Sequence, residues 1–142
     1  MPVRTADAQW DGSLTEGDGR MAFGGGAFEG QYSFGSRFEE GDGTNPEELI
    51  AAAHAGCFSM QLAGVLGKEG YEPESVSTTA RIHLDKDGEG FTITRSELAS
   101  EANVGGIEEE EFQRIADEAK RVCPVSRALG AIEIGLEAKL AS

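Results

Sequence analysis

Residues 44–60 read TNPEELIAAAHAGCFSM and organise the rest of the chain. Thr44 or Asn45 can cap a helix, the proline that follows suits the first helical position, and the next two glutamates suit the positive end of the helix dipole. The pattern predicts a helix that runs to about Gly67 or Gly70. It is apolar nearly all round, which predicts a buried helix. Its many alanines and glycines carry little bulk, so we expect a sheet or a second copy of the helix to pack closely against it.

Short elements on both sides of this helix predict an α+β fold. Weak alternation and frequent Gly and Asp over residues 6–34 predict a β-meander. Beyond the helix, alternation over residues 75–84 and again over residues 91–98 predicts a hairpin. An apolar stripe over residues 107–122 predicts a second helix, and residues 131–138 alternate as a final strand.

Length and charge limit the classes of function. The 142 residues fit one domain that spans 1–142. A formal charge of −14 argues against a nucleic-acid partner, because phosphate binding needs clustered Lys and Arg. No stretch is expected to reach the ~20 apolar residues of a membrane span, and no signal peptide is visible, so we expect no membrane partner and a cytoplasmic location. In a reducing compartment a cysteine pair is more often catalytic or metal-binding than structural.

The two cysteines lie far apart in sequence, Cys57 inside the predicted helix and Cys123 at the start of the segment CPVS. A structural bridge, a metal half-site, a hydrolytic nucleophile and a redox pair are all open. His54 and Cys57 have ligand spacing on one helix face, but a closed zinc site needs four ligands. His54 could also act as a base for a Cys57 nucleophile, although simple packing is the favoured interpretation. We expect neither a metal nor another cofactor.

The redox interpretation needs a cation. The thiolate is the reactive form, and Cys57 lies too deep in its predicted helix for the dipole to lower its pKa much. Arg37, just before the helix, is the better candidate for that cation, and Arg20 is the other. A guanidinium can also bind a peroxide oxygen. Cys123 precedes Pro124 and can cap a helical turn, which suits a leaving or resolving thiol.

Residues 44–60 and residues 123–126 together resemble the OsmC/Ohr family of osmotically inducible and organic-hydroperoxide-resistance proteins. Arg37-Phe38-Glu39 before the helix resembles the OsmC branch, and so does His54, where the Ohr branch usually has an aromatic residue. The resemblance covers essentially the whole chain. It implies an OsmC-like fold, in which antiparallel sheets surround a long buried central helix, and an intertwined homodimer.

The resemblance also implies a thiol peroxidase that reduces organic hydroperoxides, with hydrogen peroxide as a further candidate substrate. It implies that Cys57 is the peroxidatic cysteine, that Cys123 is the resolving one, and that Glu47 orients Arg37. Arg20 falls near the turn where the Ohr branch carries its arginine. The implied reductant is a dithiol of the lipoyl type. The alternative function is a non-catalytic acidic binding module on the same fold, with inert cysteines.

Helix geometry adds one argument about the dimer. Glu47 and Cys57 are ten residues apart, which is ~15 Å of helical rise. Glu47 therefore cannot approach Cys57 within one straight helix. If two copies pack antiparallel and cross near Ala52, Glu47 of the partner subunit lies near Cys57. We therefore expect an active site that is shared across the two-fold axis.

Overall fold

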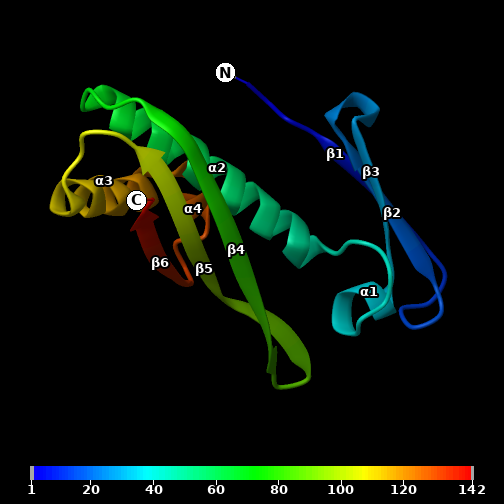
Figure 1. Ribbon diagram of the computed structural model, residues 1–142. Coiled ribbons are helices and arrows are strands. Elements are labelled where there is room, and N and C mark those ends of the chain that lie inside the picture. Colours follow the sequence, from blue (N-terminus) through cyan, green and yellow to red (C-terminus); the bar gives the residue numbers. More distant parts are fainter. Residues whose placement is uncertain (1, 142) are drawn as a thin grey trace. The chain divides into compact units, whose positions relative to one another are not determined.

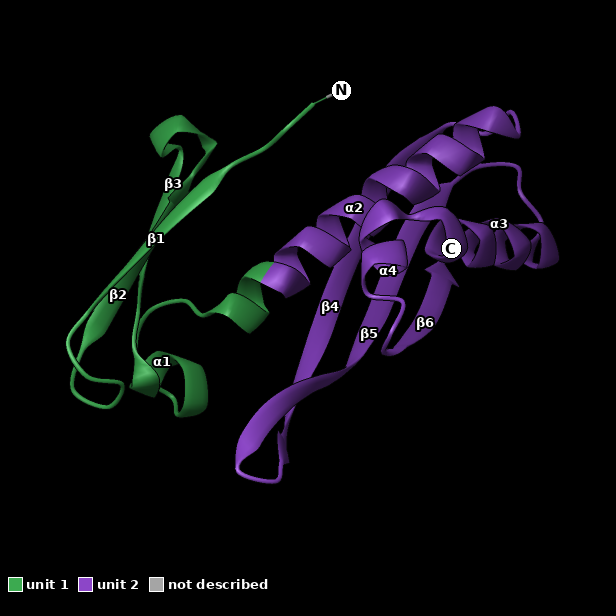
Figure 2. Ribbon diagram, turned by 180° about the vertical axis from the view of Figure 1, so that it is seen from behind, with its two compact units in different colours: residues 1–49 green, residues 50–142 purple. Residues whose placement is uncertain are grey.

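The computed structural model describes residues 2–141, and each of its two compact units contains a three-stranded sheet (Figure 1). The units are residues 1–49 and residues 50–142, coloured separately in Figure 2. The predicted α+β class is confirmed. That the whole chain forms a single domain stays a prediction.

The smaller unit is a meander followed by a short helix. Its elements are β1 (Ala6–Asp11), β2 (Asp18–Phe23), β3 (Phe28–Tyr32) and α1 (Phe34–Phe38), with a 3₁₀ turn at Gly24–Gly26. The strands pair antiparallel in the order β1-β2-β3, as the sequence predicted. All three glycines of the turn have positive φ, a conformation that other residues rarely adopt. The sequence did not predict α1, which carries Arg37.

The larger unit combines a sheet with three helices. Its elements are α2 (Pro46–Lys68), which begins just before the unit boundary, β4 (Pro73–Asp87), β5 (Gly90–Val104), α3 (Glu109–Val122), α4 (Pro124–Ala128) and β6 (Glu133–Leu140). The β4–β5 hairpin is confirmed, but β6 pairs with β5 in parallel. The expectation of purely antiparallel sheets is therefore wrong for β6. A parallel neighbour needs a crossover connection, and α3 and α4 form it.

The hydrophobic core lies between this sheet and its helices (Figure 1). The largest core side chains are all fully or almost fully buried: Phe58, Leu62 and Leu66 from α2, Leu98 from β5, and Phe112 and Ile115 from α3. Burial of such side chains is the main favourable term in folding. The core side chains all come from residues 58–119, within the larger unit.

One face of α2 is exposed in the single chain. We call it the small-residue face, and it consists of Ala52, Ala53, Gly56, Met60, Gly64 and Gly67. Met60 is 80% exposed, and a Cβ added at any of the three glycines would meet no atom within 4 Å. The prediction of a buried helix is confirmed for the face that packs on the sheet, and for the small-residue face burial by a second copy stays a prediction.

The same helix corrects the prediction about membranes. By length and composition alone, α2 is apolar enough to cross a membrane, because residues 49–67 contain no Asp, Glu, Lys or Arg. The prediction that no stretch reaches this length is wrong. The finding is weak evidence for a membrane, since a core helix passes the same test, and Phe58, Leu62 and Leu66 of α2 are buried in the core.

Candidate active site

Helices α2 and α4 bring the two cysteines together. The Sγ atoms of Cys57 and Cys123 are 3.0 Å apart, although 66 residues separate them in sequence. Both are free thiols; Cys123 is buried, whereas Cys57 is partly exposed. Cys123 is the N-cap of α4 and Pro124 follows within its first turn, as the sequence predicted. Cys57 is thus the thiol that solvent reaches, with Cys123 behind it.

The surroundings of the two thiols push their pKa values apart. Burial raises the pKa of Cys57, and its hydrogen bond with Cys123 raises it further. Burial alone would raise the pKa of Cys123 too, but interactions with Cys57, Ser126 and Val125 outweigh it, so the pKa of Cys123 is lowered. No lysine or arginine is among the groups that shift the pKa of Cys57 in the described chain. The single chain therefore offers Cys57 no cation that would favour its thiolate, and the role of an arginine beside it stays a prediction.

His54 lies one turn before Cys57 and is fully buried. Its Nδ1 is 2.7 Å from Ser96 Oγ and its Nε2 is 2.7 Å from Ser126 Oγ. Burial lowers the pKa of His54, so the ring is neutral near pH 7. The packing interpretation is right about burial, but it missed that both ring nitrogens are hydrogen-bonded. With both nitrogens bonded to serines, neither is free to act as a base on Cys57.

The metal interpretation finds no support in this geometry. Among residues 2–141 there is no group of three His, Cys, Asp or Glu side chains that could hold a metal ion. His54 directs its nitrogens to serines, so it offers no ligand beside the two sulfur atoms.

In the smaller unit, Arg37 and Glu47 form a bidentate ion pair. Arg37 Nε donates to Glu47 Oε1 at 3.0 Å, and Nη2 donates to Oε2 at 2.9 Å. Glu47 is only 8% exposed. Two further hydrogen bonds fix α1 to the start of α2: the Ser36 hydroxyl donates to the Thr44 carbonyl at 2.8 Å, and Asn45 Nδ2 donates to the Ser36 carbonyl at 2.9 Å. The guanidinium therefore has a fixed orientation.

Arg20, the other candidate cation, has a different setting. It lies on β2 and pairs with Glu29 of β3, with side-chain exposures of 63% and 47%. Ion pairs this exposed contribute little free energy and fix little geometry. Of the two arginines, Arg37 is the one that the structure orients.

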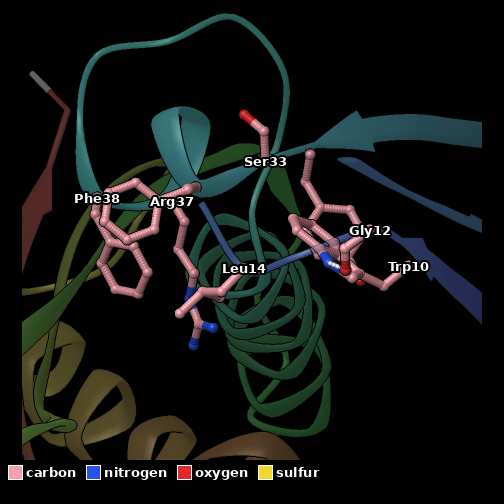
Figure 3. A pocket seen from close by; sticks show the side chains of 8 residues that line it. Trp10, Gly12, Leu14, Ser33, Arg37 and Phe38 are labelled. Atoms are coloured by element: carbon pink, nitrogen blue, oxygen red, sulfur yellow. Dashed lines mark hydrogen bonds between the residues drawn. The ribbon is translucent and has the colours of Figure 1, made fainter. Parts of the chain in front are cut away.

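Arg37 also lines a pocket of about 420 Å³ within the smaller unit (Figure 3). Phe38 and Arg37 lie on one side, Trp10 on the other and Leu14 between them (Figure 3). Phe34 completes a mostly apolar wall. Such a pocket suits a ligand with an apolar body and a polar head. Sequence reasoning missed Trp10 and Leu14; the one available signal was that Trp10 is the single tryptophan.

The fold and the site define a small α+β protein with an internal pair of thiols, and comparisons with known proteins place it in a family. The profile of the family described as "OsmC-like protein" matches residues 39–137. The chain is 46% identical over 140 residues to peroxiredoxin OsmC of Escherichia coli strain K12, covering 98% of this chain and 97% of that protein. The chain belongs to the OsmC family.

Two further relatives come from the Ohr branch. The chain is 35% identical over 98 residues to the organic hydroperoxide resistance protein of Xanthomonas axonopodis pv. citri, covering 68% of this chain and 67% of that protein. The crystal structure of the organic hydroperoxide resistance protein OhrB of Bacillus subtilis matches with a TM-score of 0.72 and 26% identity, over 95% of this chain and 98% of that one. The resemblance inferred from residues 44–60 and 123–126 is confirmed.

Proposed function

We propose that this chain is a thiol peroxidase that reduces organic hydroperoxides, and hydrogen peroxide as a lesser substrate, through Cys57 and Cys123. The observation that carries the proposal is the 3.0 Å separation of the two Sγ atoms, with the partly exposed Cys57 in front of the buried Cys123. The names of relatives in both branches, peroxiredoxin and organic hydroperoxide resistance protein, support it.

The chemistry has three steps. The Cys57 thiolate attacks the terminal oxygen of ROOH; an S–O bond forms, the O–O bond breaks, and RO⁻ takes a proton and leaves as alcohol. The Cys123 thiolate then attacks the sulfur of the Cys57 sulfenic acid; an S–S bond forms, the S–O bond breaks, and hydroxide takes a proton and leaves as water. A dithiol reduces the disulfide by exchange and is itself oxidised to a disulfide. By family resemblance this reductant is of the lipoyl type. In this proposal the reaction takes place in the cytoplasm, the location expected from the sequence.

Arg37 supplies the cation that Cys57 lacks. A guanidinium beside the sulfur stabilises the thiolate, and its remaining N–H groups bind the peroxide and stabilise the leaving oxygen. Glu47 holds the Arg37 side chain through two hydrogen bonds, so the guanidinium does not have to be ordered during the reaction. The apolar wall around Trp10, Leu14 and Phe38 receives the organic part of the substrate.

A second copy of the chain completes this site. Glu47 precedes Cys57 by ten residues on one continuous helix, or ~15 Å along its axis. The small-residue face lets another α2 approach closely, and Ala52, midway between Glu47 and Cys57, lies on that face. An antiparallel crossing there brings Glu47 of the partner subunit, with the Arg37 it holds, to Cys57. The homodimer is therefore the catalytic unit in this proposal.

A count of free thiols tests the proposal. One equivalent of cumene hydroperoxide added to fully reduced protein should remove both thiols, and a lipoyl-type dithiol should restore them. Hydrogen peroxide should do the same more slowly. Thiols that survive stoichiometric peroxide would instead support the alternative, a binding module with inert cysteines. The raised pKa of Cys57 in the single chain is the one observation that favours this alternative.

A further inference from the structure

The buried interior of the larger unit contains a run of hydrogen bonds that the steps above do not use. His54 of α2 joins Ser96 of β5 to Ser126 of α4, with 2.7 Å at each end. Ser126 lies three residues after Cys123, the N-cap of α4, and its backbone and side chain are among the groups that lower the pKa of Cys123. Ser96, His54 and Cys123 are fully buried, and Ser126 is 5% exposed. The run joins three elements and ends at Ser126, three residues after the thiol assigned above as the resolving one.

The number of available hydrogens sets the direction of these bonds. Within residues 2–141, the hydrogen bond that Ser96 Oγ makes is to His54 Nδ1. A buried hydroxyl hydrogen without an acceptor costs free energy, so the Ser96 hydroxyl donates to Nδ1. A neutral imidazole that accepts at Nδ1 carries its hydrogen at Nε2. His54 Nε2–H therefore donates to Ser126 Oγ.

Ser126 then has one hydrogen left to give. Its oxygen already accepts from His54, so its hydroxyl hydrogen is free to point at the sulfur of Cys123. Hydrogen bonds to a thiolate stabilise the charged form. No local sequence pattern indicates this arrangement, because Ser96 and Ser126 lie 42 and 72 positions from His54.

We propose that His54 and Ser96 are positioning residues for Cys123: they hold Ser126 so that its hydroxyl hydrogen points at Cys123 Sγ. The inference rests on the proposed function in one respect, namely that Cys123 resolves the Cys57 sulfenic acid. In that step the Cys123 thiolate attacks, and the rate of attack depends on the thiolate fraction. The serine–histidine run thereby speeds formation of the disulfide without touching the peroxide.

The test titrates Cys123 alone. In a Cys57→Ser background the chain keeps one thiol, and the ultraviolet absorbance of its thiolate is followed against pH with no peroxide present. Ser126→Ala should raise the midpoint by about one pH unit, which is a roughly tenfold fall in the thiolate fraction near pH 7. His54→Leu should raise it less, since the Ser126 hydroxyl then loses its orientation but keeps its hydrogen.

Three comparisons separate positioning from general damage to the core. Ser100→Ala is the matched control, because Ser100 is also on β5, is 4% exposed and bonds Thr78 at 3.0 Å, outside the run; it should leave the midpoint unchanged. His54→Gln keeps an amide that can donate to Ser126, so it should return the midpoint toward the parent value. Adding His54→Leu to Ser126→Ala should shift nothing further, since His54 acts only through Ser126.

An unchanged midpoint in Ser126→Ala would overturn the proposal, whatever midpoints the two His54 variants show. So would an equal shift in Ser100→Ala, or a further shift from His54→Leu once the Ser126 hydroxyl is gone. The titration contains no hydroperoxide, so its outcome is independent of peroxidase activity. A chain that failed the thiol count could still show the predicted midpoints, and the two failures are therefore distinguishable.

Discussion

Replacement of Arg37 by methionine should make Cys57 a weaker acid and a slower nucleophile. Two unit charges about 4 Å apart interact with about 4 kcal/mol at an effective dielectric constant of 20. At 1.36 kcal/mol for each pKa unit, the upper bound on the shift is about 3 units. The Arg37 side chain is 37% exposed, so solvent screening lowers this bound. We expect the pKa of Cys57 to rise by roughly one to two units in Arg37→Met.

The assay is the rate constant for cumene hydroperoxide, measured by rapid mixing and thiol labelling across a range of pH. The Cys57 thiolate reacts, so a higher pKa moves the rising limb of the profile to higher pH. The rate near pH 7 should fall roughly 10- to 100-fold, since each unit is a factor of ten. Part of the loss should persist at high pH, because the guanidinium also binds the peroxide oxygens.

Arg20→Met is the matched control, since it removes an arginine that is also paired with a glutamate but is far more exposed. Its pH profile should coincide with that of the parent. A parent-like profile in Arg37→Met would refute the assignment of the cation. A shift in Arg20→Met alone would transfer the role to Arg20.

Two further predictions concern the resolving thiol and the dimer. Cys57→Ser should show no turnover, whereas Cys123→Ser should consume one equivalent of hydroperoxide and then stall as the sulfenic acid, which mass spectrometry detects. Gly56→Leu should leave the chain folded, because a Cβ there meets nothing within 4 Å, yet it should convert the dimer to monomer in light scattering and abolish peroxidase activity. Gly67→Leu, an equally open position ~17 Å further along α2, should change neither.

Each of these has an outcome that would contradict it. Steady turnover by Cys123→Ser would mean that Cys123 does not resolve the intermediate. A dimeric and active Gly56→Leu would place the helix crossing away from the small-residue face, and loss of the dimer in Gly67→Leu would move the crossing toward the end of α2.

Local signals predicted the start of α2 well. Asn45 Oδ1 accepts from the Glu48 backbone N–H at 2.7 Å. Asn45, one of the two N-caps predicted from the sequence, therefore caps the helix in the structure. Cys123 likewise occupies the N-cap position before Pro124, although its side chain makes no capping hydrogen bond. The small α1 helix was missed because its capping box, Ser33 with Ser36, uses serines where Glu or Gln is the usual signal.

Long-range features could not be predicted in this way. Alternation over β6 gives a strand but not its direction, so its parallel pairing with β5 was missed. The serines that bond His54 come from β5 and α4, and no local pattern joins them. Family resemblance, not physical pattern, supplied the pairing of Cys57 with Cys123 and of Arg37 with Glu47.

The separation of the two cysteines along the chain links the oxidation of these thiols to thermal stability. A bond between sulfur atoms 66 residues apart closes a long loop, and on chain entropy alone this stabilises the folded state by about 4 kcal/mol. The loop contains β4, β5 and α3, most of the larger unit. The oxidised protein should therefore melt at a higher temperature than the reduced protein, and equal melting temperatures would argue against this crosslink. Each turnover would then raise the free energy of unfolding of the larger unit and lower it again. The protein would therefore be most stable while hydroperoxide is abundant.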